Sequence, residues 1–178
     1  MKVFIAGPRA ITKLNNMIEE RLKNIYTSNI SVLVGDAAGI DKVVQEFYHN
    51  LNYSDVNVYA VNGKARNNIG SWPVKNVEVE KNIRGFGCYA TKDIKMAEDA
   101  DYGFMIWNGK SKGTLNNMIN LIKYNKQTLL YFYPENQFYN IRNSQNLELV
   151  IDKCEAEAKI MYERLTNSTN QIALVDLK

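Results

Sequence analysis

The stretch DYGFMIWNGKSKGTLNN, residues 101–117, decides the fold of this chain. Its first half has the composition of a buried β-strand, and the glycines at positions 109 and 113 break that run before helical spacing resumes. The stretch therefore predicts a strand, a tight loop and the exposed N-terminus of a helix. Because a first helical turn has unpaired backbone N–H groups and a partial positive charge, we expect this junction to bind a phosphate or another anion.

The letters GKS at residues 109–111 resemble the end of a Walker A loop, but the rest of that motif is missing. A Walker A loop has another glycine five positions before the glycine that precedes its lysine. That position is Phe104, inside the apolar run, and Gly103 is one residue too early. We therefore expect no ATP hydrolysis of the P-loop kind.

Short apolar runs recur along the chain, and segments with helical periodicity separate most of them. The runs are residues 3–6, 30–34, 56–61, 101–107 and 128–133. Strands that alternate with helices in this way form a parallel sheet covered on both faces. We predict an α/β fold, a single doubly wound Rossmann-like domain with a mostly parallel five-stranded sheet, over residues 1–134.

A long segment at residues 62–88 interrupts this alternation and shows no clear periodicity. Structureless loops of that length in small domains are usually functional lids or disordered. Arg66, Trp72 and Arg84 favour a lid, since disordered segments seldom carry large aromatic residues. The alternative is that Trp72 packs on the domain and the arginines are solvated.

Residues 135–178 also depart from the alternation. Apolar residues at helical spacing predict one amphipathic helix over residues 144–166, and residues 172–175 have the composition of a short strand in the tail. We expect this segment to pack on the core or on a partner subunit, and we expect a homo-oligomer.

Three glycine-containing loops each follow a predicted strand, so they are expected to meet at the carboxyl edge of the sheet. Each loop alone is also explained as a strand-to-helix turn that needs small residues. Together with the predicted lid they give a set of candidate ligand-binding residues: Gly7, Pro8, Arg9, Gly35, Asp36, Ala37, Gly39, Arg66, Trp72, Arg84, Asn108, Gly109, Lys110, Ser111, Gly113, Thr114 and Asn117.

Composition limits the classes of function that remain. The 178 residues carry a net charge of +3, with Lys and Arg scattered, which makes no case for nucleic acid by itself. Cys88, Cys154 and a single His49 exclude most Cys/His metal frameworks and a histidine-centred triad. We predict no metal and no cofactor. The apolar runs are too short for a signal peptide or a membrane span, so we expect a cytoplasmic protein with no membrane partner.

The three loops together resemble the SLOG superfamily, Rossmann-like proteins related to the LOG phosphoribohydrolases, the DNA-processing protein and the nucleoside deoxyribosyltransferases. The resemblance rests on Gly7-Pro8-Arg9, on GDAAGID at residues 35–41, and on the loop at residues 109–114. It covers roughly residues 1–133. It implies binding of a nucleotide or a nucleotide-derived ligand, and in some branches cleavage of an N-glycosidic bond.

The enzymatic branches carry a glutamate in the helical turn after Gly-Thr, where this chain has Asn116 and Asn117. An amide cannot act as a carboxylate nucleophile or stabilise an oxocarbenium ion with a full negative charge. It can still form hydrogen bonds to a ribose hydroxyl or a base edge. We therefore prefer a sensor or sequestering protein for a nucleotide-like small molecule, such as a nucleotide, a cyclic nucleotide or an ADP-ribose-type signal, without glycosidic catalysis.

Two alternatives stay open. The first is an N-glycosidase, phosphoribohydrolase or deoxyribosyltransferase that uses Asp36 or Asp93, although helix capping explains both residues as well. The second is a single-stranded DNA-binding module. We rank this alternative low, because nucleic acid is not an expected partner of a chain with scattered cations.

Overall fold

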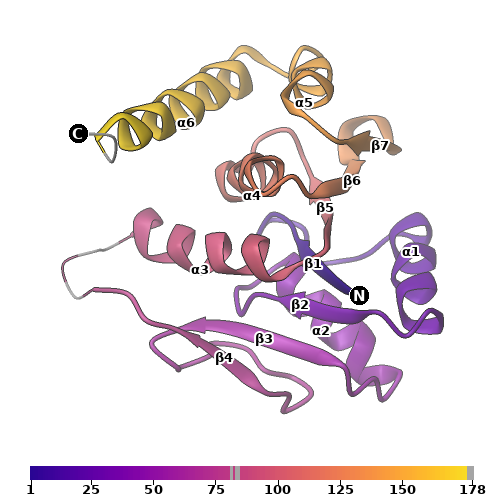
Figure 1. Cartoon of the computed structure of the whole chain (residues 1–178). Coiled ribbons are helices and arrows are strands. Elements are labelled where there is room, and N and C mark those ends of the chain that lie inside the picture. The colour runs from indigo at the N-terminus through magenta and orange to yellow at the C-terminus, as the bar shows by residue number, and fades with distance from the viewer. Residues whose placement is uncertain (81, 83–84, 176–178) are drawn as a thin grey trace.

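One β-sheet forms the centre of the computed structural model, which describes residues 1–80, 82 and 85–175 (Figure 1). Its strands are β1 (Lys2–Ala6), β2 (Ser31–Val34), β3 (Val56–Val61), β4 (Val74–Val77), β5 (Tyr102–Trp107), β6 (Gln127–Phe132) and β7 (Gln137–Ile141). The helices are α1 (Asn16–Thr27), α2 (Ile40–Asn50), α3 (Phe86–Asp99), α4 (Lys112–Lys123), α5 (Ser144–Ile151) and α6 (Ala156–Val175), with a 3-10 turn η1 (Tyr133–Glu135).

The order of the strands identifies the edge at which a ligand is expected. The sheet runs β4-β3-β2-β1-β5-β6-β7, parallel from β4 to β6, with β7 antiparallel to β6. The chain adds strands outward from β1 to β4 and then returns to the other side of β1 to form β5. In such sheets ligands bind beyond the carboxyl ends of the strands where the order reverses, here between β1 and β5.

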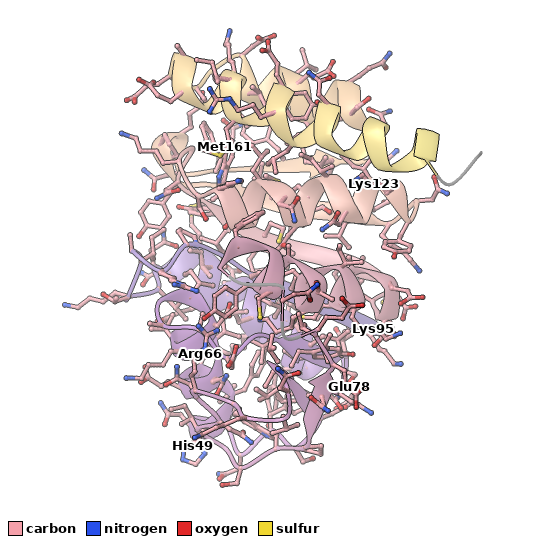
Figure 2. The ribbon with its side chains drawn as sticks, turned by 90° about the vertical axis from the view of Figure 1, so that its left-hand side faces the viewer. His49, Arg66, Glu78, Lys95, Lys123 and Met161 are labelled. Carbon is pink, nitrogen blue, oxygen red and sulfur yellow. The ribbon has the colours of Figure 1, made fainter. Side chains whose placement is uncertain are left out.

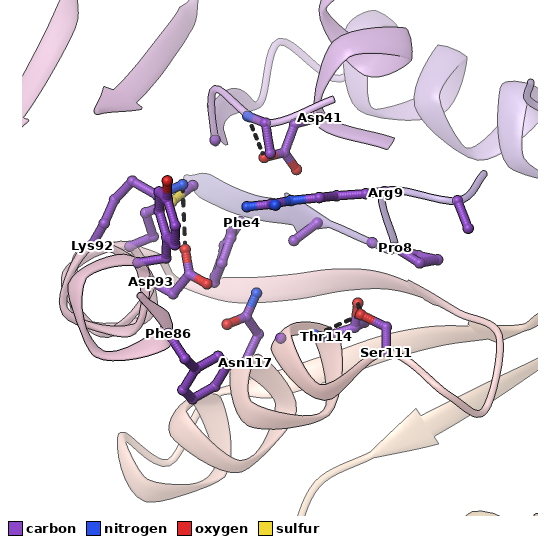
Figure 3. A pocket seen from close by; sticks show the side chains of 18 of the residues that line it. Phe4, Pro8, Arg9, Asp41, Phe86, Lys92, Asp93, Ser111, Thr114 and Asn117 are labelled. Carbon is purple, nitrogen blue, oxygen red and sulfur yellow. Dashed lines mark hydrogen bonds and ion pairs between the residues drawn. The ribbon is translucent and has the colours of Figure 1, made fainter. Parts of the chain in front are cut away.

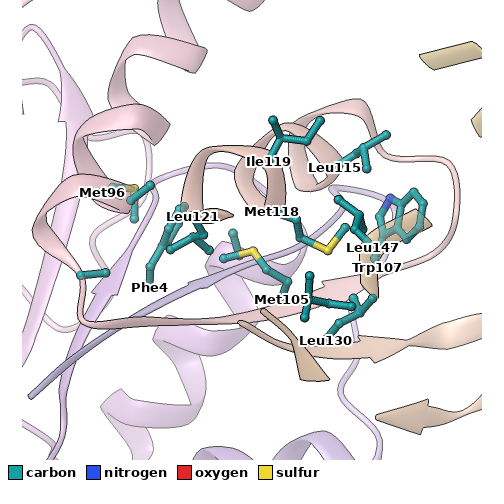
Figure 4. Close-up of a cluster of buried hydrophobic side chains, with 14 of the residues drawn as sticks. Phe4, Met96, Met105, Trp107, Leu115, Met118, Ile119, Leu121, Leu130 and Leu147 are labelled. Carbon is teal, nitrogen blue, oxygen red and sulfur yellow. The ribbon is translucent and has the colours of Figure 1, made fainter. Parts of the chain in front are cut away.

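Each face of the sheet is covered by its own helices. Alternate residues of β1 point to opposite faces, so Val3 and Ile5 pack among the side chains of α1 and α2 while Phe4 packs with α3 and α4. Figure 4 shows the cluster that contains Phe4, in which Met118 and Leu121 of α4 pack toward the strands. Burial on both faces explains why the central strands are apolar throughout.

The predicted α/β class and mostly parallel sheet are confirmed, but the predicted number of five strands is wrong, because the described residues form seven. The two missed strands lie at the edges of the sheet. β4 exposes three of its four residues, and β7 exposes or half-exposes all but Ile141. Edge strands such as these lack the continuous apolar run that identified the others.

The segment at residues 62–88 is not one structureless loop. It contains β4 and the first residues of α3, and it also contains residues 81, 83 and 84, which lie outside the described residues. Trp72 packs in the cluster under α1 and α2, where its indole N–H donates to the Tyr53 carbonyl at 2.8 Å. Its ring is 6.4 Å from that of His49, which Figure 2 shows at the lower end of the molecule.

The C-terminal segment contains two helices rather than the single predicted one. α5 ends at Ile151 and α6 begins at Ala156, after a short turn that the apolar spacing did not reveal. Residues 172–175 continue α6, so the predicted strand there is wrong. Met161 packs against the core cluster between α6 and the body of the protein (Figure 2). Every helix within the described ranges is too short or too polar to span a bilayer.

Candidate functional site

A pocket of about 580 Å³ opens where the strand order reverses, between the loops that follow β1, β2 and β5 (Figure 3). One face of α3, from Phe86 to Met96, and the first turns of α4 form its remaining walls. The residues that line it are Phe4, Ala6, Gly7, Pro8, Arg9, Ala10, Gly35, Ala37, Asp41, Arg66, Gly85, Phe86, Tyr89, Lys92, Asp93, Met96, Asn108, Lys110, Ser111, Gly113, Thr114 and Asn117.

The three predicted loops therefore do meet at one cavity. The predicted residues that line it are Gly7, Pro8, Arg9, Gly35, Ala37, Arg66, Asn108, Lys110, Ser111, Gly113, Thr114 and Asn117. Asp36, Gly39, Trp72 and Gly109 do not line it, and Arg84 lies outside the described residues. Trp72 faces the opposite core, so it is not part of a lid over this pocket.

Asp36 is held by the segment after β3 instead of facing the cavity. Its carboxylate accepts hydrogen bonds from the Arg66 side chain at 2.7 and 3.0 Å and from the Arg66 backbone N–H at 3.1 Å. Burial alone would raise the pKa of Asp36, but the hydrogen bonds from Arg66 and the charge of Lys92 lower it overall. The ionised carboxylate thus positions Arg66 at the mouth of the pocket.

Lys92 and Asp93 lie side by side in the middle of α3 and reach the floor of the pocket. The Lys92 side chain is only 4% exposed, and its Nζ lies 3.3 Å from Asp93 Oδ1 and 3.6 Å from Asp36 Oδ1. Burial lowers the pKa of Lys92, but the surrounding carboxylates raise it overall, so the ammonium stays charged. Burial also raises the pKa of Asp93, although Lys92 opposes that shift.

Asn117 projects from the first half of α4 toward Asp93 (Figure 3). The amide is oriented so that its nitrogen donates two hydrogen bonds, one to the Gly113 carbonyl at 3.1 Å and one to Asp93 Oδ2 at 3.2 Å. Asp93 of α3 and Asn117 of α4 therefore meet at one point of the floor, beside Lys92.

Asp41 is the third carboxylate of the site and lies in the first turn of α2. Its Oδ2 accepts the Ala37 N–H at 3.2 Å. Burial raises the pKa of Asp41 to about 6, although the positive charge of Lys92 opposes that shift. A Cβ on Gly35 would lie 2.2 Å from Asp41 Oδ2 and 2.6 Å from Lys92 Nζ, so the absence of a side chain there allows both groups to approach the loop.

The loop after β5 uses several of its own backbone donors. Asn108 Oδ1 accepts the N–H groups of Lys110 at 3.1 Å and Ser111 at 3.0 Å. Ser111 caps α4, because its hydroxyl accepts the Thr114 N–H at 3.3 Å. Part of the anion-binding capacity that the sequence predicted at this helix N-terminus is therefore already satisfied within the protein.

Cations and aromatic rings alternate at the mouth of the pocket. The guanidinium carbons of Arg9 and Arg66 lie 5.3 and 4.6 Å from the centre of the Tyr89 ring. Lys112 Nζ lies 4.1 Å from the centre of the Phe86 ring. Both rings are more than a third exposed. Lys110 also reaches the mouth, where it forms an exposed ion pair with Glu155 at 3.4 Å.

The contribution of α3 to the site was missed from the sequence, apart from Asp93. Its residues at spacings of three and four lie on one face of the helix and are the signal that was available: Phe86, Tyr89, Asp93 and Met96. The burial of Lys92 had no such signal. A lysine is almost never buried unless it is paired, and its partners Asp36 and Asp41 come from a distant part of the sequence. Among the described residues, no group of three or more His, Cys, Asp or Glu side chains is arranged to hold a metal ion.

Comparison with known proteins gives a likeness of fold. No family model matches the sequence, and no curated protein matches it either. Among solved structures, the chain is similar to DNA processing protein A from Helicobacter pylori, with a TM-score of 0.58 and 13% identity over 94% of this chain and 81% of that one. That protein belongs to a branch named in the SLOG resemblance, so the Rossmann-like fold is supported.

The similar structure is described as revealing a single-stranded DNA-binding mode. This finding contradicts the preference for a small-molecule sensor or sequestering protein, and it contradicts the expectation that nucleic acid is not a partner. It favours the alternative that was ranked low. The homo-oligomer and the catalytic roles of Asp36 and Asp93 stay predictions.

Proposed function

We propose that this protein binds single-stranded DNA across the mouth of the pocket between β1 and β5. The observation that carries the proposal is a cluster of cations beside exposed aromatic rings. Arg9 and Arg66 both lie over the Tyr89 ring, and Lys112 lies over the Phe86 ring. Proteins that bind single strands combine cations that follow the backbone with exposed rings on which bases stack. The likeness to a single-stranded DNA-binding protein supports the same choice.

The arrangement of the mouth matches the two parts of a single strand. Neither Arg9 nor Lys112 forms an ion pair with a carboxylate among the described residues, so both can neutralise phosphates. Tyr89 and Phe86 are 36% and 40% exposed, and stacking of a base on an exposed ring contributes about 1–3 kcal/mol. Scattered cations in the sequence thus become a local cluster once α3 and the loops meet.

We also propose that the chain is a distant member of the SLOG superfamily. The order of the three glycine loops along the chain and their meeting at one pocket support this assignment. The fold of the similar solved structure supports it as well.

Fluorescence anisotropy with a labelled oligomer of about 15 deoxythymidines tests the proposed binding. We expect saturable binding that weakens about twentyfold between about 50 and 200 mM salt. Tyr89→Ala and Arg9→Ala should each weaken binding about tenfold, since each removes a contact worth about 1–2 kcal/mol.

Matched controls lie at the opposite edge of the sheet. Tyr124 at the end of α4 is 38% exposed, close to the 36% of Tyr89, and Lys23 is exposed near the end of α1. Tyr124→Ala and Lys23→Ala should bind as the unmodified protein does. Absence of binding at low salt, or equal affinities of all four variants, would refute the proposal.

A further inference from the structure

The floor of the pocket has more hydrogen-bond acceptors than its one buried cation can satisfy. Asp41, Asp93 and Asn117 all line it, and Lys92 is the buried cation among the described lining residues. The mouth, in contrast, is cationic and aromatic. A ligand that fits both parts has phosphates outside and a group rich in hydrogen-bond donors inside.

The size and the walls of the cavity suit one flat base. A volume of about 580 Å³ lies in the range of small-molecule pockets. Phe4 and Met96 belong to the buried core and also form part of the cavity wall, so apolar side chains lie beside the carboxylates. Proteins that recognise single strands commonly take an unstacked base into such a pocket and read its Watson–Crick edge.

Asp93 is the group best placed to read that edge. A carboxylate offers about four acceptor positions on its two oxygens. Lys92 uses one position on Oδ1, at 3.3 Å, and Asn117 uses one on Oδ2, at 3.2 Å. One position on each oxygen is left, and the side chain is 18% exposed, so the remaining positions can be reached from the cavity.

Two adjacent acceptors select guanine among the DNA bases. Guanine presents N1–H and N2–H₂ side by side on its Watson–Crick edge, so both can donate to one carboxylate in bidentate fashion. Adenine and cytosine place an acceptor nitrogen beside their amino group, and thymine places carbonyl oxygens on both sides of its N–H. Each of these three would bring an acceptor against a carboxylate oxygen.

We propose that the pocket binds a single unstacked guanine of the bound strand, with Asp93 accepting from N1–H and N2–H₂ and Asn117 and Lys92 holding Asp93 in place. This specificity rests on the proposed binding of single-stranded DNA. It adds a preference for one base to a surface that otherwise binds any sequence.

The test compares oligomers of about 15 deoxythymidines that differ in one central base, in the anisotropy assay. We expect the oligomer with guanine to bind about tenfold more tightly than those with adenine, cytosine or thymine. An oligomer with hypoxanthine, which lacks the N2 amino group, should lose most of that advantage. These measurements use the unmodified protein, so they do not depend on the folding of a variant.

Variants then assign the preference to the floor. Asp93→Asn should reduce the ratio of guanine to thymine affinity to about one, because an amide presents a donor where guanine needs a second acceptor. Glu98 is an exposed acid on the same helix and pairs with Lys95. Glu98→Gln should therefore leave the ratio unchanged. A thermal melt of each variant confirms that it is folded.

The two proposals fail in different ways. If no oligomer binds, the proposed function itself is wrong. If the thymidine oligomer binds with the expected salt dependence but all four bases bind equally, only the guanine pocket is refuted. A guanine preference that survives in folded Asp93→Asn would also refute the role of Asp93.

Discussion

Gly39 lies at the start of α2 and allows the loops after β1 and β2 to touch. Its φ is +77°, in the region that favours glycine, and a Cβ there would lie 2.4 Å from the Arg9 Cα. The obstruction is backbone, which cannot move aside as a flexible side chain can. The position of Arg9 at the pocket therefore depends on a residue that does not line the pocket.

Gly39→Ala should lower the free energy of unfolding by about 2–4 kcal/mol, through the strained φ and the overlap with the Arg9 backbone. Gly113→Ala is the matched control, since a Cβ at that position in α4 meets nothing within 4 Å. It should be neutral or stabilising by up to about 1 kcal/mol. Urea unfolding of both variants measures the difference, and equal effects would contradict the interpretation of Gly39.

Asp41 should make the stability of the protein fall as pH rises. Its folded pKa of about 6 lies above the ordinary value of 3.8, so between these pH values the folded state binds more protons than the unfolded state. The free energy of unfolding therefore decreases by at most about 3 kcal/mol as pH rises from about 4 to 6. The neighbouring charges are Lys92, Asp93 and Asp36.

Asp41→Asn should remove this part of the pH dependence, since the amide keeps an oxygen for the Ala37 N–H but does not titrate. Chemical unfolding of both proteins at several pH values between about 4 and 7 measures the effect. We expect a flatter profile for the variant. Parallel profiles would show that the Asp41 carboxyl is not the titrating group.

At the scale of elements, apolar composition predicted the buried strands and failed at the edges of the sheet. β5 is almost entirely buried, so its sequence is a continuous apolar run. β4 has the sequence VKNV and buries only Val77, a pattern that does not differ from a loop. The split between α5 and α6 was missed for a related reason, because apolar residues continue at helical spacing across the turn between them.

The candidate site was predictable where it is built from local sequence and not where distant segments meet. Glycines after strands indicated the loops, because turns of this kind require them. Tertiary packing decided the rest: it placed Trp72 in the far core, and it brought Lys92 close to Asp36 and Asp41 of the segment after β2. Neither outcome follows from the spacing of residues in one segment.

Trp72→Phe should therefore affect stability and leave DNA binding unchanged. The variant loses the hydrogen bond to the Tyr53 carbonyl and part of a buried ring, which together contribute about 1–3 kcal/mol. A thermal melt measures the first effect and anisotropy with the thymidine oligomer the second. Tyr89→Ala should show the opposite pattern, and a large loss of affinity in Trp72→Phe would restore the predicted lid.

At the scale of the whole molecule, the net charge of +3 understates the charge that a strand would meet. Asp36, which is buried, already neutralises Arg66. The ion pair of Lys110 with Glu155 is exposed, so a phosphate can replace Glu155 in it. Among the described residues at the mouth, Arg9, Lys110 and Lys112 are then the cations available to phosphates. Each contact with a single strand contributes about 0.7 to the slope of log K against log salt. We expect a slope of about −2.

Arg9→Ala should reduce the magnitude of that slope by about 0.7, whereas Lys23→Ala should leave it unchanged. Anisotropy titrations at four salt concentrations provide both values. A slope that is the same in the two variants would place the phosphate contacts on another surface.

The central position of β1 has a consequence for synthesis of the protein. The Lys2 N–H donates to the Asp101 carboxylate at 2.7 Å across 99 residues of sequence, and β1 pairs along its length with β5. On a ribosome that adds about 5–20 residues per second, β1 waits roughly 5–20 s for this partner. During that interval one edge of an apolar strand exposes unpaired backbone N–H and C=O groups, which can pair with other chains until β5 emerges.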